Sequence, residues 1–135
     1  AYDMQPSIDM GVEVKSRAMG DKSDAFEVDL CISVQARRNE DTMFSAELIY
    51  SGVFQFMNVR PDDVEPLIWI ECPRLLFPFS RQILAEITRE GGYPPLLITP
   101  IDFTPRYWSE LRERQERATA QGGLPPQAAA GGASF

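Results

Sequence analysis

The chain of 135 residues contains no histidine and only two cysteines. The missing histidine removes the commonest general base and metal ligand, and every catalytic triad that needs an imidazole. Two cysteines cannot build the disulfide framework of a small secreted domain, and Cys31 and Cys72 lie in different sequence surroundings. These absences count against an enzyme and against an oxidising compartment, so we expect a protein of the reducing cytoplasm.

Positive charge and long apolar runs are also scarce. The 13 basic side chains stand against 20 acidic ones, a formal net charge of -7, which disfavours nucleic acid and anionic membranes as partners. The densest apolar stretch, Leu67 to Phe79, is interrupted by charged residues and prolines and does not resemble a membrane span. The first residues lack the charged and apolar regions of a signal peptide, and we expect none.

The remaining candidates for catalysis are weak. A nucleophilic role for Cys72 would need a thiolate that nothing nearby in the sequence stabilises. Asp62 with Asp63, and Glu40 with Asp41, are adjacent carboxylates whose side chains point apart, and both pairs suit helix starts or turns. The sequence has no phosphate-binding glycine loop and no cysteine pair at metal-binding spacing. We therefore predict a non-enzymatic binding protein without cofactor or metal.

Alternating apolar residues predict three β-strands in the first half of the chain. The first covers Ile8 to Lys15, the second Phe26 to Ala36, and the third Phe44 to Tyr50. Short polar turns separate them, which predicts an antiparallel sheet with one buried and one solvated face. Beyond Gly52 the alternation is less regular, which predicts a bulge or a segment buried on both faces.

The second half of the chain predicts helices. Pro61 opens an acidic first turn, and helical spacing of apolar residues continues to Gly91, so we predict one long helix bent by its internal prolines. Residues 93–103 contain three prolines and are typical of an extended crossover. Thr104 as N-cap and Pro105 as first residue predict a second helix ending near Thr119.

The composition after Ala120, mostly Ala, Gly, Pro and Gln, is typical of a disordered segment. We predict one domain over residues 1–119 and a disordered C-terminal tail over residues 120–135. Strands first and helices second predict the α+β class.

Several segments are similar to one protein family: AELIYSGVFQF (46–56), ECPRLLFPF (71–79), GGYPP (91–95) and PIDF (100–103). With them the chain resembles the SecB family of protein-export chaperones, over roughly Phe26 to Leu111. The resemblance implies a four-stranded antiparallel sheet packed with a long kinked helix and a second C-terminal helix. Family members have a further strand and loop before the position of Ile8, so that first strand is expected to be missing or truncated here.

The resemblance also implies a function. It implies a cytoplasmic, ATP-independent holdase that binds unfolded secretory precursor polypeptides and delivers them to the motor SecA for Sec-dependent export. Such a chaperone is a homotetramer built as a dimer of dimers, without cofactor, nucleic acid or membrane insertion.

A holdase must expose apolar surface to partners without a fixed shape. The proline-rich crossover and its surroundings supply such residues, although core is the commoner role for any single one. The expected client-binding residues are Phe56, Tyr93, Leu96, Leu97, Ile98, Phe103, Tyr107 and Trp108. A mixed stripe on the long helix is the expected subunit interface: Phe79, Gln82, Glu86 and Arg89. The resemblance carries over one SecA-binding position, Glu47.

Two other interpretations stay open. A SecB-like chaperone dedicated to a single client, such as an antitoxin, would use the same groove. A small-ligand-binding or hotdog-like enzyme is possible in principle, because a sheet wrapped around a long helix can enclose an acyl pocket. The missing histidine and the absence of a positioned catalytic carboxylate count against the enzyme.

Overall fold

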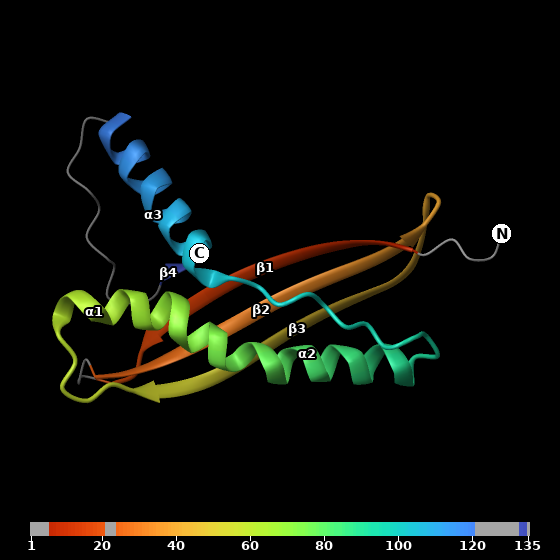
Figure 1. The fold of residues 1–135 in the computed structure, drawn as a ribbon, viewed down its shortest axis with the longest axis horizontal. Coiled ribbons are helices and arrows are strands. Elements are labelled where there is room, and N and C mark those ends of the chain that lie inside the picture. Colours follow the sequence, from red (N-terminus) through yellow and green to blue (C-terminus); the bar gives the residue numbers. More distant parts are fainter. Residues whose placement is uncertain (1–5, 21–23, 121–132, 135) are drawn as a thin grey trace.

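A computed structural model gives the structure of the chain and describes residues 6–20, 24–120 and 133–134. Three long antiparallel strands form most of one sheet: β1 (Ser7–Ala18), β2 (Ala25–Arg38) and β3 (Asp41–Gln55). The two-residue strand β4 (Ala133–Ser134) pairs with β1, so the strand order is β3-β2-β1-β4 (Figure 1). The predicted α+β class with an antiparallel sheet is confirmed. The fourth strand comes from the C-terminal end of the chain and does not precede β1.

The helical half begins with α1 (Pro61–Pro66), continues without a break through a π-helical segment, η1 (Leu67–Glu71), and becomes α2 (Cys72–Glu90). Pro73 is the second residue of α2 and has no N–H to donate to the preceding turn, which is one reason for irregular helix there. The path bends along its length over one face of the sheet (Figure 1). The predicted long kinked helix is therefore present.

The second helix, α3 (Phe103–Ala120), begins slightly earlier than predicted. The Asp102 carboxylate accepts a hydrogen bond from the backbone N–H of Thr104 at 3.1 Å, which makes Asp102 the N-cap residue. The predicted N-cap, Thr104, is wrong. Asp102 is a stronger N-cap than Thr104, because its carboxylate accepts a charge-assisted hydrogen bond and a threonine hydroxyl does not.

The core lies between the sheet and the helices. On the central strand β2, every second side chain is buried, as the alternation predicted: Val28, Leu30, Ile32, Val34 and Ala36. Leu84 and Trp69 cover this face from the helical side. Within the described part of the chain, none of the helices combines the length and apolar character that crossing a membrane requires.

Both alternatives predicted beyond Gly52, a bulge and a segment buried on both faces, are wrong. Gly52 pairs in register with Val28, β3 alternates between exposed and half-buried side chains to its end at Gln55, and the register shift lies between Ala36 and Arg37. Gly52 instead makes room for α2. A Cβ atom at residue 52 would lie 3.0 Å from Cδ2 of Leu76, closer than side chains normally pack.

The predicted domain boundary stays a prediction. Helix α3 ends at Ala120, and β4 takes two residues of the predicted tail. Residues 121–132 and residue 135, the rest of that tail, lie outside the described residues.

Candidate functional site

The crossover between α2 and α3 is held in place by three hydrogen bonds from side chains. The Tyr93 hydroxyl donates to the carbonyl of Met43 on β3 at 2.7 Å. The Thr88 hydroxyl accepts from the backbone N–H of Leu96 at 2.9 Å. The Arg81 guanidinium donates to the carbonyl of Ile98 at 2.9 Å. A segment whose prolines prevent regular structure therefore still has a fixed position over the sheet.

The predicted client-binding residues separate into three groups by exposure. Three belong to the core, with 3–5% of their surface exposed: Ile98, Phe103 and Tyr107. Three are half-buried: Phe56, Tyr93 and Leu96. Two are exposed, Leu97 at 62% and Trp108 at 49%. In this conformation Leu97 and Trp108 offer the most apolar surface, and the buried residues form the support behind them.

The structure does not bring all of these residues together. The ring of Tyr93 packs on Phe44 near the start of β3, with 4.8 Å between ring centroids. The ring of Phe56 packs on Phe26 beyond the end of β3, at 5.5 Å. Phe56 therefore lies at the opposite end of β3 from Tyr93. Trp108 packs edge-to-face on Tyr107 at 5.0 Å, on α3.

Tyr107 links α3 to the long helical path. Its hydroxyl donates a hydrogen bond to the Glu65 carboxylate at 3.3 Å. Burial and, after it, the negative charge of Glu65 raise the pKa of Tyr107 to about 12. The phenol is therefore neutral at physiological pH, and its role here is a structural contact between α3 and α1.

The exposed side of α2 carries the predicted subunit interface. Phe79 is 56% exposed and stacks on Tyr50 of β3, with 6.0 Å between ring centroids. Gln82, Glu86 and Arg89 are also exposed, and the Gln82 amide donates to Glu86 at 3.2 Å. Two further apolar side chains of α2 are exposed, Leu75 and Ile87. The exposure of Leu75 was not predicted, although the helical spacing of Leu76 with Leu84 indicates that Leu76 is the leucine that faces the sheet.

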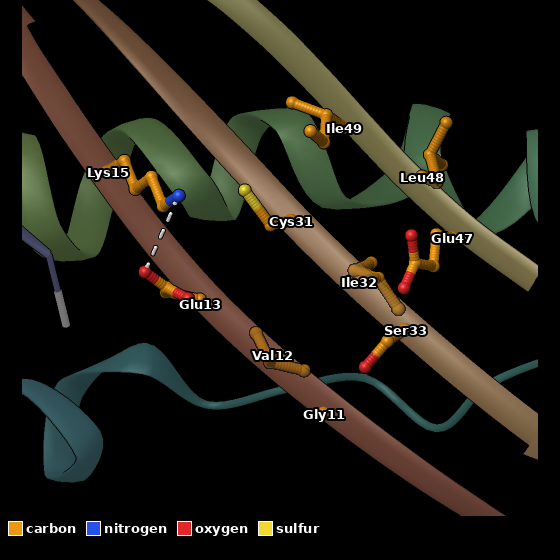
Figure 2. Close-up of a pocket in the computed structure, with 10 residues that line it drawn as sticks. All are labelled: Gly11, Val12, Glu13, Lys15, Cys31, Ile32, Ser33, Glu47, Leu48 and Ile49. Atoms are coloured by element: carbon orange, nitrogen blue, oxygen red, sulfur yellow. Dashed lines mark ion pairs between the residues drawn. The ribbon is translucent and has the colours of Figure 1, made fainter.

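The solvated face of the sheet carries Glu47 and a shallow depression of about 370 Å³ (Figure 2). The Lys15 ammonium and the Glu13 carboxylate form an ion pair there, with 3.8 Å between Nζ and Oε1. Glu47 is exposed on β3, on the face that the alternation predicted to be solvated. The residues around the depression come from three strands: Gly11, Val12, Glu13, Lys15, Cys31, Ile32, Ser33, Glu47, Leu48 and Ile49.

Neither cysteine is activated as a nucleophile. Burial raises the pKa of the Cys72 thiol to about 12, and the adjacent Glu71 adds to the shift, so the nucleophilic thiolate is disfavoured. Burial also raises the pKa of Cys31. Among the described residues, no cluster of side chains has the composition and spacing of a metal site.

Comparison with known proteins points to one family. A family model described as preprotein translocase subunit SecB matches residues 1–114. The protein-export protein SecB of Hyphomonas neptunium is 51% identical over 114 residues, which cover 84% of this chain and 69% of that protein. The protein-export protein SecB of Maricaulis maris is 46% identical over 113 residues, which cover 84% of this chain and 64% of that protein. The chain thus spans about two thirds of the length of these relatives.

A solved structure also matches the fold. A SecB-like chaperone of Mycobacterium tuberculosis, in complex with a ChAD peptide from an antitoxin, aligns with a TM-score of 0.60 over 72% of this chain and 73% of that one. The two sequences are 14% identical, so this likeness concerns the fold alone.

Proposed function

This chain belongs to the SecB family, and on that basis we propose that it is an ATP-independent holdase that binds unfolded secretory precursors and delivers them to SecA for export. The family match over residues 1–114 is the observation that carries the proposal. The protein acts by binding alone, without an enzymatic step. It works in the cytoplasm, where precursors are still unfolded.

The exposed apolar side chains of the crossover and α3 support client binding. Leu97 lies on a crossover fixed by hydrogen bonds at Leu96 and Ile98, and Trp108 lies on helix α3. Little ordering entropy is therefore lost when a client contacts them. Apolar contact contributes about 25 cal/mol per Å² buried and requires no particular client sequence. The net charge of -7 opposes self-association while this surface is exposed.

Two further surfaces have proposed partners. Exposed Glu47, on the solvated face of the sheet, is a contact for SecA. The exposed side of α2, with Phe79, Gln82, Glu86 and Arg89, is the interface of a homotetramer assembled as a dimer of dimers.

The direct test is suppression of aggregation of an unfolded precursor in the absence of ATP, with the native mass measured in parallel. We expect the protein to suppress aggregation when its concentration is close to that of the precursor. A protein that leaves aggregation unchanged would contradict the proposal.

The substitution Leu97→Asp tests the site itself. We expect it to weaken precursor binding about tenfold, as expected for losing one exposed apolar contact of about 1.5 kcal/mol. Thr99→Asp is the matched control, because Thr99 is also exposed on the crossover. Equal binding by both variants would exclude Leu97 from the client site.

A further inference from the structure

The crossover turns adjacent apolar side chains to opposite sides. Leu97 is 62% exposed, whereas Ile98 is 5% exposed and Leu96 is half-buried. Residues 93–102 lie outside the helices and strands, so no regular hydrogen-bond ladder decides which of these side chains faces outwards. In an extended backbone, successive side chains point to opposite sides, and a slip of one residue exchanges the two sides. A slip in the crossover would therefore bury Leu97 and expose Ile98.

Two side chains of α2 bond to the backbone on either side of Leu97. The Thr88 hydroxyl accepts from the N–H of Leu96 at 2.9 Å, and the Arg81 Nε donates to the carbonyl of Ile98 at 2.9 Å. Positions 81 and 88 are separated by about two helical turns, so both lie on the side of α2 along which the crossover runs back (Figure 1). The two bonds thus fix the backbone just before and just after Leu97.

The stability of the fold does not by itself explain an arginine at position 81. Arg81 is half-buried, and the ion pairs of the described residues belong to other basic side chains: Lys15, Arg17, Arg37 and Arg74. Withdrawing a guanidinium from water without a carboxylate partner costs free energy. An apolar side chain of similar volume is often neutral or stabilising in such a place. The cost is accounted for if the hydrogen bond of Arg81 serves client binding.

We propose that Arg81 is a positioning residue for client binding, which holds Ile98 inwards and so presents Leu97 outwards to an unfolded polypeptide. The inference rests on the proposed holdase function and specifies how its client surface is kept ready. The donor Nε belongs to the rigid, planar guanidinium, so its direction is fixed once the side chain is packed. A contact that is already ordered loses less conformational entropy on binding than one that must first be ordered. Arg81 thus acts on the client through Leu97 and need not touch it.

Three substitutions at position 81 test this role through the affinity for a fluorescently labelled unfolded precursor. Arg81→Met keeps the volume and removes the donor, and it should lower the affinity about fivefold, a large part of the Leu97 contact. Arg81→Gln places its amide nitrogen where Nε was, without the charge, and should keep most of the wild-type affinity. Arg81→Lys keeps the charge but has a methylene at that place, and should bind more weakly than Arg81→Gln. The control Arg38→Met removes an exposed arginine at the end of β2 and should bind like the wild type.

A double-mutant cycle shows whether Arg81 acts through Leu97. In a protein that already carries Leu97→Ala, the further change Arg81→Met should leave the affinity unchanged, because the side chain that Arg81 positions is gone. NMR provides a second readout, which a general loss of stability would not reproduce. The methyl groups of Leu97 should become more mobile in Arg81→Met than in Arg81→Gln, while the melting temperatures of the two variants stay close.

The outcomes separate this inference from the proposed function. Wild-type protein that does not bind an unfolded precursor would overturn both. Wild-type affinity in Arg81→Met would overturn the positioning role and leave the holdase function standing. An undiminished effect of Arg81→Met in the Leu97→Ala background would overturn it too, because Arg81 would then contact the client directly or support the whole surface. Should Arg81→Met fail to fold, the other two variants decide, and Arg81→Lys binding as tightly as Arg81→Gln would overturn the inference.

Discussion

At the scale of single residues, Tyr107 makes the stability of the fold depend on pH in the alkaline range. Its pKa is raised to about 12 in the folded chain, above the ordinary value of 10.0. The folded state therefore holds this proton more tightly than the unfolded state. The contribution of Tyr107 to the free energy of unfolding is complete below pH 10 and is lost as pH rises towards 12. We expect Tyr107→Phe to flatten the fall in unfolding free energy over this range, measured by urea denaturation. Identical slopes in both proteins would contradict the assignment.

Gly52 gives a second test at this scale. Because a Cβ atom there would already lie 3.0 Å from side-chain atoms of Leu76 and Phe54, the larger side chain of Gly52→Val must displace these side chains from their packing between β3 and α2. We expect a loss of about 1–3 kcal/mol in the free energy of unfolding, typical of overpacking. The control Ser51→Val adds similar bulk at the neighbouring exposed position and should cost little. Valine favours strands, so strand propensity would not lower stability in either variant. Comparable losses in the two variants would mean that the close approach of Leu76 and Phe54 does not determine the effect.

At the scale of elements, the crossover depends on Thr88, a buried side chain whose hydroxyl accepts from the N–H of Leu96. Thr88→Val keeps the shape and leaves that N–H without its partner. We expect a loss of about 1–3 kcal/mol in stability and faster amide exchange at Leu96. Thr99→Val, an exposed change in the same segment, is the control. Unchanged exchange at Leu96 in Thr88→Val would show that packing alone fixes the crossover.

The elements also show what the sequence allowed us to predict. The alternation of apolar and polar residues located the strands, and the prolines located the bent helix and the crossover. Both patterns could be interpreted because they depend on the backbone conformation of a few neighbouring residues. Side-chain exposure was harder. Leu97 and Ile98 are adjacent apolar residues in an irregular segment, yet one is exposed and the other buried. Without a helix or strand period, only tertiary contacts such as the hydrogen bond to the Ile98 carbonyl decide which way each points.

At the scale of the whole molecule, the proposed tetramer depends on the exposed side of α2. Phe79 is the largest apolar side chain that this side exposes. We expect Phe79→Glu to reduce the native mass in sedimentation, because assembly would bury the new charge without a partner. Arg112→Glu, an exposed change on α3, is the control and should leave the mass unchanged. A full-mass Phe79→Glu assembly would place the interface elsewhere.

The two free thiols also determine where a thiol-reactive dye attaches to the folded protein. Such dyes react with the thiolate, and Cys72 is buried with a pKa raised to about 12, whereas Cys31 is half-buried on the solvated face of the sheet. A maleimide dye should therefore label the folded protein at Cys31 and reach Cys72 only after denaturation, as peptide mass mapping would show.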